Sequence, residues 1–442
     1  MKRVFSNPLV ALAAGLCLRL FFVLKYPASS GDTVLYDQMA TNWLKHHVYA
    51  MDVGGAVTPV DLRMPGYPAF LAIVYALTGR TGDGARIWVL LAQIGVDLLA
   101  CLVIARLAEL LAATSDGIPT DKRVRAVALW LAVLCPSTAN YCAVELTEVF
   151  AGLWTALTCC AVVVALRRIE KPNFLVKGSH LPLGRSAEYS ALGAGIIVGM
   201  GTLFRPETPL LLVAAAVVFG GLLFRLQGFK RWVMVSLAMG LGCVTVLSPW
   251  AARNLITLGE PQFLAPKYSN LPGELVPYGF MAWEKTWLYR MKDCYLVPWK
   301  LNDESIDVEQ IPARAFDTSE EKQRVAAILE QYNNDLTLTS EEDAEFAKLA
   351  RERTARHPLR TYLWLPMARG ATMWFTPRIE LIPVSGHVFP LRQMREDDPV
   401  DQEITILLFV LNLAYVGLGL WGAVRLWRWS SIARPEIGRA HV

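Results

Sequence analysis

The residues best placed to do chemistry lie in one short stretch, residues 31–70, which follows directly after an apolar segment. It carries Asp32 and Asp37, together with Arg63 two residues before the sequence Pro-Gly-Tyr-Pro. A carboxylate at the mouth of a low-dielectric cavity can act as a general base, because partial loss of hydration raises its pKa. A guanidinium beside a rigid turn is suited to clamp a phosphate. The stretch therefore indicates proton transfer next to a bound phosphate at a membrane surface.

Each of these residues also has a structural interpretation. Gly-Asp before the amphipathic run 33–47 is typical of a helix N-cap, so Asp32 could cap that helix, serve as a base, or do both. Arg63 could instead extend its charged end from an apolar surface into water. The sequence also leaves open whether Asp32 or Asp37 is the base, although Asp32 lies nearer to the membrane exit.

Charged residues recur at the ends of later apolar segments. Glu145 and Glu148 lie three residues apart in CPSTANYCAVELTEVF, and Glu148 lies deeper in the adjoining span, where an ionisable group is a functional candidate. Arg205 in LFRPET and Arg253 in SPWAARN lie at outer helix ends, which the positive-inside rule disfavours for arginine. One hypothesis is that Arg63, Arg205 and Arg253 surround a common anion. The alternative is that these residues are ordinary charged helix ends or caps.

Two further charges lie inside apolar runs. Arg19 and Asp97 could pair between the first two spans, since each would reduce the cost of burying the other, and we interpret this pair as structural. The histidines, cysteines and carboxylates show no metal-ligand spacing, and no phosphate-binding glycine loop is present. We therefore expect no divalent metal, no other assignable cofactor and no nucleic-acid partner.

The elements that must position these residues are membrane-spanning helices. The chain has 442 residues, of which 54% are hydrophobic, and a mean hydropathy of +0.35, which soluble proteins of this size rarely reach. A helix needs about 20 apolar residues to cross a bilayer, and these runs do not alternate as barrel strands would. The predicted fold class is an all-α polytopic membrane protein with eight spans. We place the spans at about 8–24, 87–111, 124–140, 147–166, 189–204, 208–224, 232–250 and 402–424.

Charge fixes the expected orientation. A further apolar helix at residues 67–78 is too short to span, so we expect it at the membrane surface. The lysine and arginine clusters between spans then fall on one side, which the positive-inside rule makes cytoplasmic together with the N-terminus. We expect an inner-membrane protein whose active site faces the periplasm or the exterior. The segments on that face are 25–86, 141–146 and 251–401.

The chain divides accordingly. Residues 1–250 form a transmembrane catalytic module that includes the first periplasmic loop, 251–401 form a large, mainly helical periplasmic segment, and 402–435 form the last span. Within the periplasmic segment, an amphipathic helix with Phe346, Leu349, Ala350 and Arg353 on one face is expected to stop at His357-Pro358. Residues 436–442, EIGRAHV, back-translate into a common sequencing-adapter sequence, and we expect the natural chain to continue instead.

The ordered motifs resemble one enzyme superfamily. GDTVLYDQMATNWLKHHVY followed by LRMPGYPAFLAIVYALTG resembles the first periplasmic loop of GT-C glycosyltransferases of the family 39-like branch. This branch uses polyprenyl-phosphate sugars and includes protein O-mannosyltransferase-like and aminoarabinose-transferase-like enzymes. ELTEVF, LFRPE, SPWAARN and HPLRTYLWLPMARGATMWFTPR resemble later blocks in the same order. The resemblance covers nearly the whole chain and implies a GT-C-like fold, but it does not specify a substrate.

The resemblance also implies roles for matched positions. It places the acceptor base on Asp32 and the contact to the lipid phosphate on Arg63. Further substrate contacts fall on Glu148, Arg205 and Arg253. We add Tyr36, Asp37 and Tyr67, which lie in the same first loop as Asp32 and Arg63. The aminoarabinose enzymes place a metal-binding carboxylate immediately before the basic residue, where this chain has Leu62, so the same metal site is not expected. Family members also usually continue with several more spans.

These features predict a membrane glycosyltransferase. It would move a sugar from a polyprenyl-phosphate donor to a glycan, lipid or protein acceptor of the cell envelope, with membrane lipid around the isoprenoid tail. Arginines would stabilise the leaving phosphate while Asp32 accepts the acceptor's proton, and this single displacement inverts the anomeric centre. Two alternatives are a transporter or flippase of lipid-linked solutes and a non-catalytic protein of envelope assembly.

Overall fold

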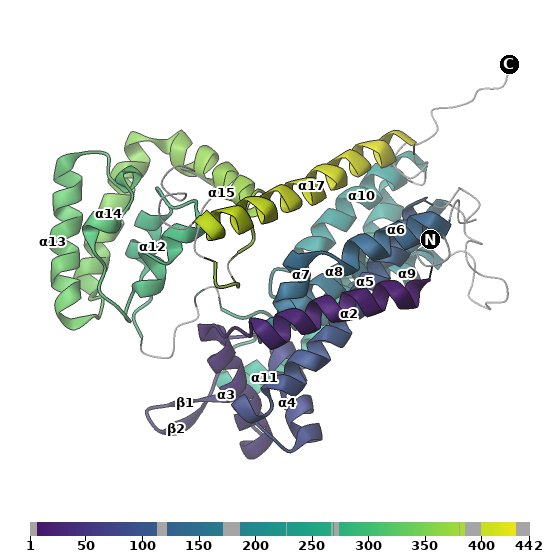
Figure 1. The fold of residues 1–442 in the computed structure, drawn as a ribbon, viewed down its shortest axis with the longest axis horizontal. Helices are drawn as coiled ribbons and strands as arrows, with labels where there is room; N and C mark the ends of the chain where they lie inside the picture. Colours follow the sequence, from purple (N-terminus) through teal and green to yellow (C-terminus); the bar gives the residue numbers. More distant parts are fainter. Residues whose placement is uncertain are drawn as a thin grey trace. The chain divides into compact units, whose positions relative to one another are not determined.

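The structure is a computed structural model, and its described part is mainly helical with one β-hairpin (Figure 1). It describes residues 7–112, 122–170, 186–226, 228–266, 268, 274–379, 381–384 and 399–429. The chain divides into two compact units. Unit 1 comprises Met1–Lys267, Ile379–Ser385 and Gly417–Val442, and unit 2 comprises Tyr268–Arg378 and Gly386–Val416. The expected adapter-derived residues 436–442, and residues 430–435 of the expected last span, lie outside the described residues.

Five described helices are long and apolar enough to cross a membrane, and a bent pair of helices makes a sixth candidate. The five are α2 (Pro8–Lys25), α5 (Arg86–Ala112), α8 (Glu148–Glu170), α11 (Phe229–Leu258) and α17 (Pro399–Trp429). The bent pair is α6 (Lys122–Val133) and α7 (Pro136–Asn140), continued by the 3-10 turn η2 (Tyr141–Ala143). The bend of 49° falls before Pro136, because the residue preceding a proline avoids the helical region. These helices agree with a membrane-embedded, largely helical protein.

The predicted count of eight spans is not reached among the described residues. Helices α9 (Ser186–Thr202) and α10 (Leu210–Leu226) occupy the two remaining predicted positions, but each has 17 residues. At 1.5 Å per residue such a helix is about 25 Å long, which is shorter than the roughly 30 Å apolar core of a bilayer. The predicted short helix after Pro-Gly-Tyr-Pro is confirmed as α4 (Gly66–Thr78).

A buried ion pair joins the first two candidate spans, as the sequence predicted. Arg19 of α2 is fully buried, and its Nε donates to Asp97 Oδ2 of α5 at 2.6 Å. The same guanidinium donates to the carbonyl oxygens of Gly15 and Val133, at 2.9 and 2.8 Å. Arg19 therefore links α2 to α5 and α6, and its position in the bundle makes its role structural.

Close glycine contacts bring α9 and α11 together. A Cβ atom on Gly195 would lie 1.8 Å from the carbonyl oxygen of Met239, and one on Gly242 would lie 2.2 Å from that of Leu192. Gly199 is four residues after Gly195, and a Cβ atom there would lie 2.7 Å from Val246 Cβ of α11. Such a small-xxx-small pattern allows two helix backbones to approach each other closely in a membrane. This contact fixes the loop that follows α9 relative to the end of α11.

The segment between α2 and α5 contains most of the predicted site. Its helix α3 (Gly31–His46) is followed by strands β1 (Ala50–Val53) and β2 (Ala56–Pro59), then by α4 and the short turn η1 (Gly82–Gly84). The strands pair antiparallel around Gly54 and Gly55, whose φ angles of 59° and 83° suit a two-residue hairpin turn. The all-α prediction missed this hairpin. The N-cap of α3 is Ser30, which corrects the capping interpretation of Asp32.

Unit 2 forms a compact helical core. Its helices are α12 (Tyr278–Glu284), α13 (Ser319–Asp335), α14 (Ser340–Arg356), the π-helix η8 (Arg360–Trp364) and α15 (Leu365–Trp374). Short 3-10 turns lie at η4 (Met291–Cys294), η5 (Pro298–Lys300), η6 (Val308–Gln310) and η7 (Ala313–Ala315). The predicted amphipathic helix is confirmed as α14, since all four face residues are buried and the helix stops at His357. Phe346, Leu349 and Ala350 belong to the same buried core as Trp283, Trp287 and Tyr332.

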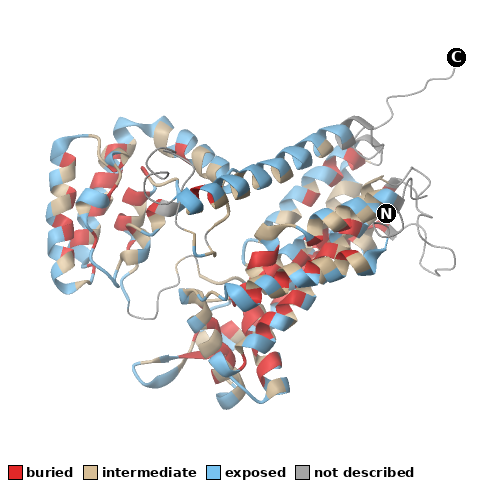
Figure 2. Cartoon of the chain, viewed as in Figure 1, coloured by how far each residue is buried: buried red, intermediate tan, exposed pale blue. Residues whose placement is uncertain are grey.

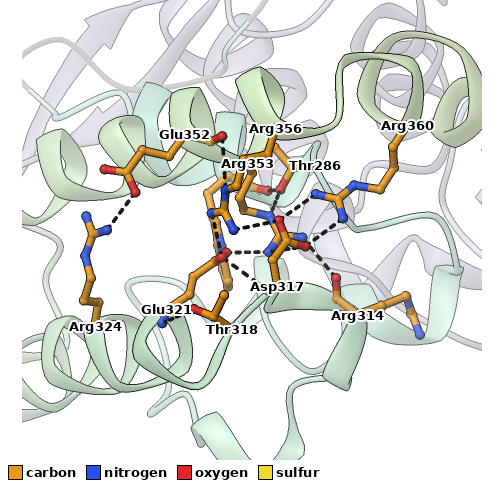
Figure 3. Close-up of polar contacts among 11 residues, drawn as sticks. Thr286, Arg314, Asp317, Thr318, Glu321, Arg324, Glu352, Arg353, Arg356 and Arg360 are labelled. Atoms are coloured by element: carbon orange, nitrogen blue, oxygen red, sulfur yellow. Dashed lines mark hydrogen bonds and ion pairs between the residues drawn. The ribbon is translucent and has the colours of Figure 1, made fainter.

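A group of charges, which we call the arginine cluster, joins α13 to the end of α14 (Figure 3). Its members are Asp317, Glu321, Arg353, Arg356 and Arg360. The guanidinium of Arg353 contacts Glu321 and lies 3.3 Å from Asp317. Arg360 donates to both oxygens of Asp317, at 2.7 and 3.2 Å. Since both carboxylates have arginine partners, the cluster fixes the two helices against each other.

Candidate active site

Tyr36 of α3 is the centre of the candidate site in unit 1. Burial raises the pKa of Tyr36 to about 12, with the negative charges of Asp32 and Glu148 acting in the same direction. The positive charges of Arg63 and Arg205 act in the opposite direction. Four predicted site residues are therefore close enough to influence one phenol, although they come from four separate parts of the sequence.

A partly exposed ion pair at the site joins Asp32 to Arg63. Arg63 Nη2 lies 2.7 Å from Asp32 Oδ1. The side chain of Asp32 is 44% exposed and that of Arg63 is 22% exposed, so solvent reaches both. The hydroxyl of Tyr49 donates to the backbone carbonyl of Arg63 at 2.9 Å, which fixes the chain just before α4. The sequence predicted functions for both charges, but it gave no sign that they touch.

The second cation, Arg205, lies in the loop between α9 and α10. Its Nη1 donates to Glu148 Oε1 at 2.9 Å, and its Nε donates to Glu207 at 2.5 Å. Burial alone would lower the pKa of Arg205, but the charges of Glu148 and Glu207 outweigh it and raise the pKa. Arg205 also donates to Thr147 at 3.3 Å. The start of α8 and this loop therefore form one charged unit that is partly open to solvent.

Gly66 explains how these two cations come to the same place. The first N–H of α4, on Gly66, donates to the carbonyl of Leu203 at 2.6 Å, and a Cβ atom there would lie 2.6 Å from that oxygen. Only glycine permits this approach without displacing backbone. Next to it, the ring of Tyr67 lies 4.9 Å from that of Tyr36, and the rings of Phe150 and Phe204 stack at 4.5 Å. The Pro-Gly-Tyr-Pro turn is therefore bound directly to the loop that carries Arg205.

The third predicted cation, Arg253, contacts backbone oxygens. It donates to the carbonyls of Tyr49 and Val60, at 2.6 and 2.8 Å, and to Asn254 at 2.9 Å. Helix α11 extends beyond the predicted end of its span at residue 250 and so includes Arg253. The charges of Arg253 and Arg63 both act on Tyr49, whose pKa is raised by burial. Arg253 thus fastens the β-hairpin to α11, and a direct contact with substrate stays a prediction.

The two aspartates of α3 point to different partners. They are five residues apart, which is about 140° beyond a full helical turn. Asp37 accepts from the hydroxyl of Tyr75 at 2.7 Å, whereas Asp32 pairs with Arg63. Of the two, Asp32 is the one that lies against Arg63, the predicted phosphate contact, and its role as a base stays a prediction.

The sequence assigned no role to Arg86, and it drew attention to Glu145 only together with Glu148. Glu145 is buried, which raises its pKa, and the nearby charge of Arg86 opposes that effect. Arg86 Nε lies 3.7 Å from Glu145, and Arg86 Nη2 donates to the carbonyl of Ala28 at 2.6 Å. Because Arg86 stands at the boundary of an apolar run, its sequence position resembles an ordinary helix end. Its contacts join α5 to the segments on either side of the site.

Among the residues that the structure describes, no group of three or more His, Cys, Asp or Glu side chains could hold a metal ion. No protein-family model, curated protein or solved structure matches the chain. Any assignment of function therefore depends on the residues and contacts described above.

Proposed function

We propose that this chain is a membrane glycosyltransferase of the GT-C type that takes its sugar from a polyprenyl phosphate. One observation carries the proposal: Asp32 is joined to Arg63 beside Tyr36, and the charges of Arg205 and Glu148 act on the same phenol. A carboxylate and two guanidinium groups thus gather beside the ends of apolar helices, where a lipid-linked substrate would present its phosphate.

The reaction that suits these groups is a single displacement at the anomeric carbon. The acceptor oxygen forms a bond to C1 while the bond from C1 to the phosphate oxygen breaks, and the electron pair of that bond stays on the phosphate. The acceptor's proton passes to the carboxylate of Asp32. Negative charge grows on the leaving phosphate, so fixed guanidinium groups at Arg63 and Arg205 stabilise the transition state more than the substrate.

The partial exposure of the Asp32–Arg63 pair supports this division of roles. Exposed ion pairs contribute only about 0–1 kcal/mol to stability, so a ligand that offers a better partner can displace one of the two groups. A phosphate dianion or diester would compete for Arg63, and Asp32 would then be free to accept a proton. In this proposal the resting ion pair opens when the donor binds.

The proposal also places the reaction on one side of the membrane. With the spans expected from the sequence, the lysine and arginine clusters would lie on the opposite side from Asp32, which by the positive-inside rule supports a site on the periplasmic or extracellular face of the inner membrane. The acceptor is then a glycan, lipid or protein of the cell envelope.

The decisive experiment measures transfer of labelled sugar in membranes that carry the chain. A panel of polyprenyl-phosphate sugars is supplied, and label in the envelope fraction is compared for the wild type, Asp32→Asn and Asp37→Asn. Loss of a general base costs about 10²–10⁴-fold, so we expect that loss for Asp32→Asn and a much smaller one for Asp37→Asn. Equal transfer by wild type and Asp32→Asn would rule out the assigned base.

The same membranes separate the alternatives. If no donor gives label in the envelope fraction, but a lipid-linked solute crosses the bilayer in a manner that depends on the chain, the protein is a transporter. If neither transfer nor transport occurs while the chain remains folded, the assembly role is favoured.

A further inference from the structure

Residues 358–375 of unit 2 carry a row of large apolar side chains that are open to solvent. We call this row the apolar stripe: Leu359, Tyr362, Leu363, Met367, Met373 and Trp374. Leu359, Leu363, Met367 and Trp374 follow one another at intervals of four, four and seven residues, which places them on one face of η8 and α15. Tyr362 and Met373 lie next to members of this series and widen the same face. Tyr362 is 75% exposed and Met373 is 68% exposed. Most of this segment and of α17 is pale blue in Figure 2.

The opposite face of the same helix is fastened to unit 2. Leu365 is buried, and Arg369 donates to the carbonyls of Leu288 and Lys285 at 2.8 and 2.6 Å. The hydroxyl of Thr372 donates to the carbonyl of Tyr289 at 2.7 Å. The helix is therefore held in an orientation that turns its polar contacts inward and its apolar stripe outward, which is the reverse of an ordinary surface helix.

The end of α15 is bonded to a candidate membrane span. The side-chain amide of Asn412 donates to the carbonyl oxygens of Trp374 and Thr376, at 2.9 and 3.0 Å. Asn412 lies 13 residues into the span Pro399–Arg425. Only 6% of the most apolar part of this span is buried. The last carbonyls of a helix need partners, and inside a bilayer water is not available to supply them. Asn412 therefore supplies the hydrogen-bond donors that the carbonyl oxygens at the end of α15 would need if that end lay alongside lipid.

From these contacts we infer that the apolar stripe is a lipid-binding surface, and that η8 and α15 enter the bilayer from its surface beside α17, so that the end of α15 lies level with Asn412. Leu407 and Val410 of α17 are as exposed as the stripe, and acyl chains are the natural cover for a span. Tyrosine and tryptophan are enriched where membrane meets water, since each ring has an apolar body and a polar tip. The polar face of the helix would then support unit 2 at the membrane surface.

This inference is independent of glycosyl transfer, and it is tested on the whole chain in a bilayer. A benzophenone-bearing amino acid replaces Met367 in one variant and Met373 in another. The matched control carries it in place of Lys348, an exposed residue of α14 in the same unit. Each chain is purified, reconstituted into vesicles of phosphatidylethanolamine and phosphatidylglycerol, and irradiated. Adducts are identified by mass spectrometry.

We expect lipid adducts at positions 367 and 373 and a several-fold lower yield at position 348. Two positions are used so that a reconstitution failure at one leaves the other as a test. Adducts between two copies of the chain at 367 and 373, without lipid, would overturn the inference and show that a second copy covers the stripe. A lipid yield at both positions no higher than at 348 would also overturn it.

Discussion

The arginine cluster of unit 2 and the candidate site of unit 1 use the same side chains in different surroundings. In the cluster, the side chain of Arg353 is 0% exposed and that of Glu321 is 3% exposed. At the site, the corresponding values are 22% for Arg63 and 44% for Asp32. Both regions join segments that are distant in sequence, but the Arg353–Glu321 pair at the centre of the cluster is closed to solvent, whereas solvent reaches both members of the Asp32–Arg63 pair.

Burial therefore separates structural charges from candidate functional charges in this chain. A sealed ion pair cannot exchange partners without exposing a charge to an apolar interior, and breaking it is costly. A half-exposed pair can exchange one partner for a ligand at little cost, because water compensates each charge while the pair is open. The following changes test this distinction, beginning with the largest expected effect.

Arg353→Met should produce the largest loss of stability. It leaves Glu321 and Asp317 without their shared buried cation, and removal of one partner of a buried ion pair costs about 3–5 kcal/mol. Hydrogen exchange of the amides of α13 and α14 measures this loss as lower protection factors, because unit 2 opens more often. Unchanged protection factors would show that the two carboxylates reach water or another partner.

Glu284→Gln should stabilise unit 2 by a few kcal/mol above neutral pH. Glu284 is buried, none of the residues that the structure describes donates a hydrogen bond to its Oε1, and burial raises its pKa from 4.5 to about 8. The folded unit therefore binds more protons than the unfolded chain between these two pH values. The stability associated with the protonated carboxyl is complete below about pH 4.5 and is lost as the pH rises to about 8.

The measurement for Glu284 is amide exchange in α12 and α14, corrected for intrinsic rates, across that range of pH. Wild-type protection should fall as the pH rises, whereas Glu284→Gln should show a flatter profile. Glu345→Gln, on the exposed side of α14, is the matched control and should behave like the wild type. Parallel profiles for wild type and Glu284→Gln would contradict the raised pKa.

Arg63→Gln should have a small effect on stability and a large effect on activity. The pair with Asp32 is partly exposed, so its loss should cost less than about 1 kcal/mol. Loss of one positioned donor to a charge that develops in the transition state costs about 10²–10³-fold in rate. Amide exchange in α3 and label transfer are measured on the same preparation. A stability loss as large as that of Arg353→Met would place Arg63 with the structural charges.

Glu352→Gln should have the smallest effect. Glu352 pairs with Arg324 at 2.8 Å on the edge of the arginine cluster, where both side chains are more than a third exposed. Exposed pairs contribute about 0.2–1 kcal/mol, so exchange in α14 should change little. A change comparable to that of Arg353→Met would mean that position in the cluster, rather than exposure, determines the cost.

Local patterns in the sequence predicted several elements of the fold. Pro-Gly-Tyr-Pro marked the start of α4, and His357-Pro358 marked the end of α14. The isolated charges Arg19 and Asp97 in two apolar runs predicted the ion pair between them. These features depend on neighbouring residues or on the high cost of an unpaired charge in an apolar run. The hairpin was missed although Gly54-Gly55 carried the signal for a two-residue turn. Its strands are short, and the surrounding apolar runs drew the assignment toward helices.

The site was harder to predict because its contacts are long-range. Residue types indicated that Asp32, Arg63, Glu148 and Arg205 could do chemistry, and all four charges act on Tyr36 in the structure. The pairing of Asp32 with Arg63, and the use of Arg253 to hold backbone carbonyls, depend on how loops pack. No pattern in a single sequence specifies that packing.

The bonds from Arg253 to the hairpin also set an order of events during synthesis. They join residues separated by 193 and 204 positions. A ribosome that adds about 5–20 residues per second needs roughly 10–40 s to make that length of chain. Throughout that interval the hairpin lacks its anchor, and the contact from Gly66 to Leu203 must also wait. The site can therefore be completed only after Arg253 has been synthesised, and the loop that carries Asp32 and Arg63 lacks these contacts until then.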